Sequence, residues 1–209
     1  TGVRAPLQTP TPRTIVPTAP PTAAPTATPT MAPAPLMVVL NGLFNNKGIG
    51  NAPGQANFDG AGYSYPASQL PSGTQITIGG VPYQFPATGS GTSDNILASG
   101  QTISLRPGNY RQAFLLAAAC WGSANGTVVI KYSDGSTSMQ PLTVLDWYTT
   151  PGALNTTYRY SPNAIDNNPV RIYAIPINLD STRTANALVL PSQQSPNGTI
   201  HIFALTLLS

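Results

Sequence analysis

The residues best suited to catalysis are scarce in this chain. It contains a single cysteine, Cys120, and a single histidine, His201. A serine or cysteine hydrolase needs a base beside its nucleophile, and His201 is the only imidazole that could serve as one. Cys120 lies in the apolar run 115–121, which predicts a buried and inert thiol, and His201 lies in an alternating run, which predicts a hydrogen-bonded strand residue. Neither pattern favours an enzyme.

The acidic residues are six aspartates, without a single glutamate. A glycosidase needs two carboxyl groups about 5–10 Å apart, one with a raised pKa, and Asp59, Asp94 and Asp146 are the residues that could converge. Their Gly, Asn and Ser neighbours are more typical of turns. Calcium at Asp59 and Asp94 is a weak alternative, because carboxylates suit it but no spacing motif supports a site. We therefore expect neither catalysis nor a cofactor. A zinc site is not expected because the sequence has no cluster of Cys and His residues to bind the ion.

Aromatic side chains offer a different chemistry, because a flat ring can stack on the apolar face of a sugar. Core packing is the alternative, since large rings dominate sandwich interiors. Trp121 ends an apolar run and is expected in the core, whereas Trp147 and Tyr148 precede a Gly/Pro-rich loop and are the better candidates for exposure. The candidate sugar-binding residues are Trp147, Tyr148, Tyr63 and Tyr65.

The elements that must position these residues read as strands. From residue 36 onward, short apolar or alternating runs are separated by turn signals, which predicts an all-β, antiparallel, jelly-roll-like β-sandwich over residues 36–209. Gly79-Gly80 predicts a hairpin within residues 76–83, and Asp134-Gly135 predicts another. The segment 199–208 is apolar on both faces near its end, so we expect it in the middle of a sheet.

Residues 1–35 differ sharply from the rest because Pro and Thr fill more than half of the positions. Such a segment cannot build a core, and proline favours polyproline II, so we expect an extended arm with a reach on the order of 100 Å. The arm is either a linker or a docking segment. Its apolar anchors for docking on a neighbouring subunit are Leu7, Ile15, Val16 and Met31.

Several features indicate a secreted or cell-surface protein. Charged residues make up only 7% of the chain, against about 25% in ordinary soluble domains. The start at Thr1 is consistent with a processed signal peptide and equally with a fragment. Candidate glycosylation sites are Thr18, Thr22, Thr26 and Thr28 in the arm, and the Asn-x-Thr sequons at Asn125, Asn155 and Asn197.

The body also resembles the jelly-roll or β-sandwich accessory domains of secreted bacterial glycosidases and cell-surface proteins, which are galactose-binding-like. The resemblance is carried by LFNNKGI at 43–49, NFDGAGYSY at 57–65, VPYQFP at 81–86, YSDGS at 132–136 and LVLP at 188–191. It implies a sandwich fold and a role in carbohydrate attachment or in support of an enzyme domain. Here a Pro/Thr-rich arm replaces that enzyme domain.

Two functions follow as expectations. The first is a non-enzymatic extracellular structural protein, a subunit of a self-assembling filament whose arm docks on the next subunit. The alternative is a carbohydrate-binding or accessory module tethered by a glycosylated stalk. A nucleic-acid partner is not expected, because the nine Lys and Arg residues are scattered singly. A membrane span is not expected either, because no apolar run approaches about 18 residues.

Overall fold

The computed structural model describes residues 1–4, 34–89, 91–192 and 198–209. The predicted docking anchors and threonine sites of the arm lie outside these residues: Leu7, Ile15, Val16, Met31, Thr18, Thr22, Thr26 and Thr28. Within the described body the only helical elements are two 3-10 turns, η1 (Asn41–Leu43) and η2 (Ala67–Gln69). None of the helices in this part of the chain has the length and hydrophobicity that a membrane crossing requires.

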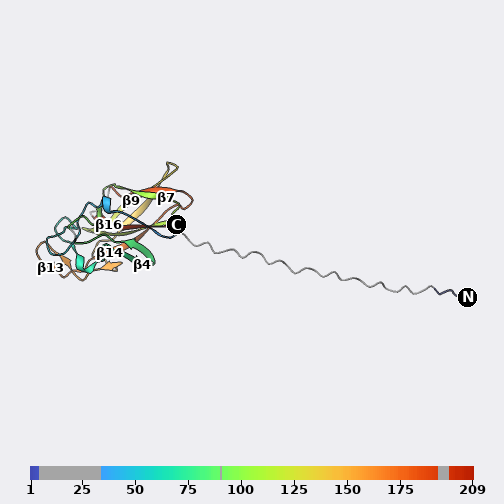
Figure 1. Ribbon diagram of the computed structural model, residues 1–209, viewed down its shortest axis with the longest axis horizontal. Helices are drawn as coiled ribbons and strands as arrows, with labels where there is room; N and C mark the ends of the chain where they lie inside the picture. Colours follow the sequence, from blue (N-terminus) through green and yellow to red (C-terminus); the bar gives the residue numbers. More distant parts are fainter. Residues whose placement is uncertain (5–33, 90, 193–197) are drawn as a thin grey trace. The chain divides into compact units, whose positions relative to one another are not determined.

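Two antiparallel sheets form a β-sandwich, as the sequence predicts (Figure 1). The larger sheet has the order β1-β16-β8-β14-β11, with β6 also paired to β16. Its strands are β1 (Leu36–Val38), β6 (Ile96–Leu97), β8 (Gln112–Cys120), β11 (Leu154–Asn155), β14 (Arg171–Asn178) and β16 (Thr199–Leu208). The smaller sheet has the order β10-β9-β15-β7, formed by β7 (Thr102–Gly108), β9 (Ala124–Tyr132), β10 (Thr137–Val144) and β15 (Ala185–Val189).

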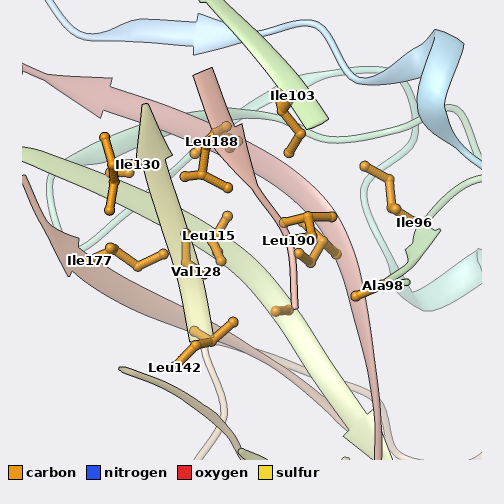
Figure 2. Packing of buried hydrophobic residues seen from close by; sticks show 14 of the residues in the cluster. Ile96, Ala98, Ile103, Leu115, Val128, Ile130, Leu142, Ile177, Leu188 and Leu190 are labelled. Atoms are coloured by element: carbon orange, nitrogen blue, oxygen red, sulfur yellow. The ribbon is translucent and has the colours of Figure 1, made fainter. Parts of the chain in front are cut away.

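The first hydrophobic core lies between these two sheets (Figure 2). In β9 and β10 every second residue is less exposed than its neighbours, and several are buried, for example Val128 and Ile130, which face Leu115 across the sandwich. The residues between them are more exposed, so the outer face of the smaller sheet meets solvent. This alternation is why the period-2 pattern of these segments could be read from the sequence.

The larger sheet is buried on both faces. Its second face packs against residues 49–86, which carry the short pairs β2 (Ile49–Gly50) with β3 (Tyr65–Pro66) and β4 (Gln75–Ile78) with β5 (Val81–Gln84). Figure 1 places β4 on the side of β14 and β16 away from β9 and β7. Burial on two faces explains why six consecutive residues of β8, 115–120, are all inaccessible. The remaining pair is β12 (Arg159–Tyr160) with β13 (Ile165–Asp166).

A β-bulge in β16 changes which residues of this strand point to each face of the larger sheet. Opposite β8, Ile202 pairs with Ala117 and Ala204 with Leu116, which leaves Phe203 as the extra residue. Ile202 before the bulge and Leu205 after it therefore both face the first core, although they are an odd number of positions apart. Phe203 and Ala204 both enter the second core.

The structure confirms the expected place of the segment 199–208, which coincides with β16 and lies inside its sheet. The Gly79-Gly80 turn joins β4 to β5, with φ values of 56° and 80° that suit glycine. The Asp134-Gly135 turn joins β9 to β10. The two-residue strands were not predicted.

Candidate functional site

A cleft of about 420 Å³ lies where the loops after β8 and β10 meet residues 59–63 and β12. Four of its nine lining residues are aromatic, and its acidic and basic side chains are two aspartates and one arginine. We call it the aromatic cleft, and its lining residues are Asp59, Tyr63, Cys120, Trp121, Gly122, Asp146, Trp147, Tyr148 and Arg159.

Asp146 fixes the two loops that carry the most exposed rings. Its Oδ2 accepts a hydrogen bond from the Gly122 amide at 2.7 Å, and its Oδ1 accepts one from the Tyr148 amide at 2.9 Å. The backbone around it is also tied to the end of β8, because the Trp147 amide donates to the Ala119 carbonyl at 2.8 Å. One carboxylate therefore holds Tyr148 directly and Trp121 through its neighbour Gly122.

Trp121 leaves the end of β8 in a left-handed conformation. Its φ is 63°, the only positive φ of a non-glycine residue in the described chain, and 61% of the residue is exposed. A tryptophan in this region is strained by about 1–2 kcal/mol. Its Nε1 donates to the Asp59 carbonyl at 2.5 Å, and Asp59 Oδ1 in turn accepts the amides of Ala61 and Tyr63. The strained residue is thus anchored across the cleft by the indole.

Arg159 supplies the only cation of the cleft. Its guanidinium lies 3.7 Å from the ring centroid of Tyr63 and 5.0 Å from that of Tyr148, and its Nε donates to Asp166 at 2.7 Å. Burial raises the pKa of Tyr148, while Arg159 acts in the opposite direction. The phenol therefore keeps its proton at neutral pH and can donate a hydrogen bond.

The structure brings together part of the predicted sugar-binding set. Tyr63 and Tyr148 line the cleft, and Tyr148 is 42% exposed. The prediction that Trp147 is an exposed platform is wrong, because its ring packs in the second core, 4.7 Å from the Phe58 ring, and the residue is 2% exposed. Tyr65 is also wrong as a platform, since it is fully buried.

Trp121 was the residue that sequence reasoning misplaced. It follows an apolar run, so burial was expected, yet the chain turns out of the sheet at this position and exposes it. The one signal that could have found it is Gly122, whose φ is 106°, because a glycine directly after an apolar run indicates such a turn.

A buried polar network lies beneath Trp121. His201 Nδ1 lies 2.8 Å from Asn95 Oδ1, and His201 Nε2 lies 3.7 Å from Cys120 Sγ. Burial lowers the pKa of His201 to about 3 and raises the pKa of Cys120 to about 11, so both groups are neutral at pH 7. The predictions of a buried Cys120 and a hydrogen-bonded strand His201 are confirmed. Their proximity was not foreseen.

Asp94 completes this network. Its carboxylate accepts the Gly48 and Ile49 amides at 2.9 and 3.0 Å and the Asn95 side-chain amide at 2.8 Å. Burial raises its pKa to about 6, although the Gly48 amide and the other donors oppose the shift. Asp94 therefore does not join Asp59 in the aromatic cleft, and the weak calcium prediction for that pair has no shared site. In the described ranges no cluster of three or more His, Cys, Asp or Glu side chains could hold a metal.

The predicted sequons are partly described. Asn125 and Asn155 are exposed, whereas Asn197 lies outside the described residues. Asn125 Oδ1 accepts a hydrogen bond from Thr143 Oγ1 at 2.7 Å, and Asn155 Nδ2 donates to the Gly152 carbonyl at 3.1 Å. Both asparagines are open to solvent, as modification requires.

Comparison with known proteins identifies the family. No curated protein matches the chain significantly. Residues 35–174 match the family described as the AziU2-like β-sandwich domain, which is more than half of the 209 residues. The matched segment contains Cys120, Asn95 and all nine residues that line the aromatic cleft. The match supports a β-sandwich family and not the narrower likeness to glycosidase accessory domains. The chain belongs to the AziU2-like β-sandwich domain family.

Proposed function

We propose that the protein binds a neutral carbohydrate in the aromatic cleft. The observation that carries the proposal is the pair of exposed rings, Trp121 and Tyr148, held at one cleft by the Asp146 carboxylate. Large exposed apolar side chains that converge on a hollow are a mark of ligand sites. Rings that are rigidly held lose little conformational entropy when a sugar stacks on them.

The polar groups suit the hydroxyls of a sugar. A carboxylate can accept about four hydrogen bonds. Asp59 Oδ1 accepts two from backbone amides, and each oxygen of Asp146 accepts one. Both carboxylates therefore have acceptor positions left for the hydroxyl groups of a sugar. The Tyr148 phenol is a donor. These groups supply orientation and the rings supply contact area, as in most small-molecule sites.

Charge selects among sugars. Two carboxylates, Asp59 and Asp146, face one guanidinium, Arg159, and that guanidinium is already paired with Asp166. A negatively charged sugar such as a uronic acid would meet net repulsion, whereas a neutral sugar would not. The volume of about 420 Å³ lies within the usual range of about 300–1,000 Å³ for small-molecule sites.

Binding is compatible with either role expected from the sequence. A carbohydrate-binding module tethered to a surface needs this cleft and uses the arm as a spacer. The filament role, with docking through Leu7, Ile15, Val16 and Met31, stays a prediction because those residues lie outside the described chain. Extracellular location and the lack of catalysis stay predictions as well.

Tryptophan emission gives a direct assay because the chain has only two tryptophans, one exposed and one buried. We expect a soluble neutral polysaccharide, drawn from a panel of β-glucan, xylan and galactomannan, to shift the emission of Trp121 and to retard the protein in affinity electrophoresis. Polygalacturonate is the charge control and should do neither. Trp121→Ala and Tyr148→Ala should each weaken binding at least tenfold, since large aromatic anchors dominate binding energy.

Met139→Ala is the matched control. Met139 is 70% exposed on β10 and does not line the cleft, so its removal should leave binding unchanged. If both Trp121→Ala and Tyr148→Ala bind the polysaccharide as well as the wild type does, the sugar must bind outside the aromatic cleft. Binding of polygalacturonate in preference to neutral polymers would refute the charge argument.

A further inference from the structure

Three side chains under the aromatic cleft have the arrangement of a nucleophile, a base and a residue that orients the base. Cys120 Sγ is 3.7 Å from His201 Nε2, and His201 Nδ1 is 2.8 Å from Asn95 Oδ1. This is the order that cysteine nucleophiles use on unrelated folds, where it is recognised by geometry and not by position in the chain. Each of the three is at most 1% exposed, so their orientations are fixed by packing.

The network determines which nitrogen of His201 carries the proton. Asn95 Nδ2 donates to Asp94 Oδ1 at 2.8 Å and to Asn46 Oδ1 at 3.0 Å, so Asn95 Oδ1 is the atom that faces the imidazole. That oxygen can only accept, and His201 Nδ1 must therefore carry the hydrogen. The lone pair of Nε2 is left facing the Thr199 hydroxyl at 3.4 Å and the Cys120 thiol at 3.7 Å, and the same hydroxyl lies 2.8 Å from Sγ. Asp94 and Asn95 thus act as positioning residues for a base.

Two hollows approach this network from either side. Cys120 lines the aromatic cleft, while His201 lines a second hollow of about 220 Å³. Both hollows are lined by Trp121 and Asp59, the two residues joined by the indole hydrogen bond. The strained and largely exposed Trp121 therefore borders both the hollow lined by Cys120 and the hollow lined by His201.

We propose that Cys120 is a nucleophile, assisted by His201, that accepts the acyl group of an ester bound in the aromatic cleft. The thiol proton moves to His201 Nε2 as Sγ bonds to the carbonyl carbon, and the carbon–oxygen bond to the alcohol breaks as that alcohol takes the proton back. Water then attacks the thioester, giving one proton to His201, which returns it to Sγ as the acid leaves. The sum is ester hydrolysis and needs no other reactant.

The thiol chemistry stands apart from sugar recognition. That the alcohol half of the ester is a neutral sugar rests on the proposed function, because the same cleft would hold it. The nucleophile itself depends only on Cys120, His201 and Asn95. Small reagents without a sugar therefore test it, and they give the same answer whether or not the protein binds carbohydrate.

Alkylation by iodoacetamide, followed by intact mass from pH 5.5 to 8.5, is the first test, and Cys120 is the only cysteine that can react. A thiol that reacts without a base speeds up about tenfold per pH unit below its pKa, since only the thiolate is nucleophilic. If the His201 imidazole is neutral at every pH tested and accepts the thiol proton, the rate of alkylation through this route does not depend on pH. We expect the wild-type rate to vary less than about threefold across the range, and His201→Gln to restore the tenfold slope.

Trp121→Gly and Asn95→Ala test the access and the orientation. The left-handed backbone suits glycine, so Trp121→Gly should keep the fold and speed labelling at least about tenfold while the profile stays flat. Asn95→Ala should lower the plateau, because Nε2 then carries the hydrogen part of the time. A merely structural role for Asn95 would change the melting temperature and leave the native-state rate of labelling unaltered.

Acyl transfer is tested with p-nitrophenyl acetate. We expect a burst of one equivalent of p-nitrophenolate and one acetyl group on the protein, both lost in Cys120→Ala and in His201→Gln. A tenfold slope in the wild type would overturn the proposal, as would native protein that is not alkylated within hours. A flat alkylation profile without any acetyl-protein would overturn the acyl-transfer step.

Discussion

The buried pair Asp94 and His201 makes a sharp prediction about acid stability. Below pH 6.5 the unfolded chain protonates His201 but the folded protein does not until about pH 3, so this histidine lowers the free energy of unfolding as the pH falls. Asp94 acts in the opposite direction, because the folded protein takes up its proton near pH 6 and the unfolded chain only near 3.8. The two effects overlap between about pH 6 and 4.

Each group contributes a slope of about 1.4 kcal/mol per pH unit within that window. In the wild type the slopes cancel, so we expect a nearly constant free energy of unfolding from pH 6 to 4. Asp94→Asn leaves the histidine unopposed, and its stability should fall by about 3 kcal/mol over the same range. His201→Gln leaves the carboxyl unopposed and should gain about 3 kcal/mol.

Urea denaturation followed by tryptophan emission, at half-unit steps of pH, measures these slopes. The slope matters and the absolute level does not, because the side-chain amide introduced by Asp94→Asn faces the Ile49 N–H and shifts the whole curve by about 1–3 kcal/mol. We keep the pH above 4 because two exposed aspartates would otherwise contribute to the result. Hydrogen bonds from Ser136 and Thr182 lower the pKa values of Asp134 and Asp180, respectively, so protonation of these two groups at lower pH would also reduce the free energy of unfolding. An Asp94→Asn curve as flat as the wild type would refute the reasoning.

Three further predictions concern the bulge and the cleft. Trp121→Gly should be more stable than Trp121→Ala by about 1 kcal/mol, since both lack the indole and only alanine keeps the left-handed strain; equal urea midpoints would contradict this. Phe203→Ala should lower the free energy of unfolding by about 3–5 kcal/mol in the same assay, because the bulge places a fully buried ring in the second core; a loss under about 1 kcal/mol would show that the site collapses freely. Asp146→Ala should weaken polysaccharide retention as much as loss of Trp121 or Tyr148 does, and unchanged retention would separate the rings from their common anchor.

The strands could be predicted because their patterns are local. The residues of β9 and β10 alternate because one face of their sheet is exposed to solvent. The run of β8 is continuously apolar because both faces of its sheet are buried. Two-residue pairs such as β2 with β3 have no period to detect, and they form because residues 49–86 must cover the second face. The sequence therefore predicted the sandwich and the β4–β5 hairpin, but not that residues 49–86 form a layer over the second face of the larger sheet.

The candidate site was harder because it depends on register. Thr199 pairs with Cys120 across β8 and β16, which places His201 diagonally beside the thiol although 81 positions separate them in the chain. A shift of one residue would turn His201 to the other face, and no pattern in either segment fixes that register. The exposure of Trp121 has a simpler cause, namely its own left-handed conformation.

The covering layer explains why the thiol network and the cleft adjoin. His201 and Phe203 are two positions apart in β16, so both face the second core, where residues 49–86 close over them. From that layer Phe58 lies 4.1 Å from the His201 ring and 4.7 Å from the Trp147 ring, which forms the inner wall of the cleft. The next residue, Asp59, holds the Trp121 indole. A single short segment therefore packs against the base, supports the cleft and holds the Trp121 indole.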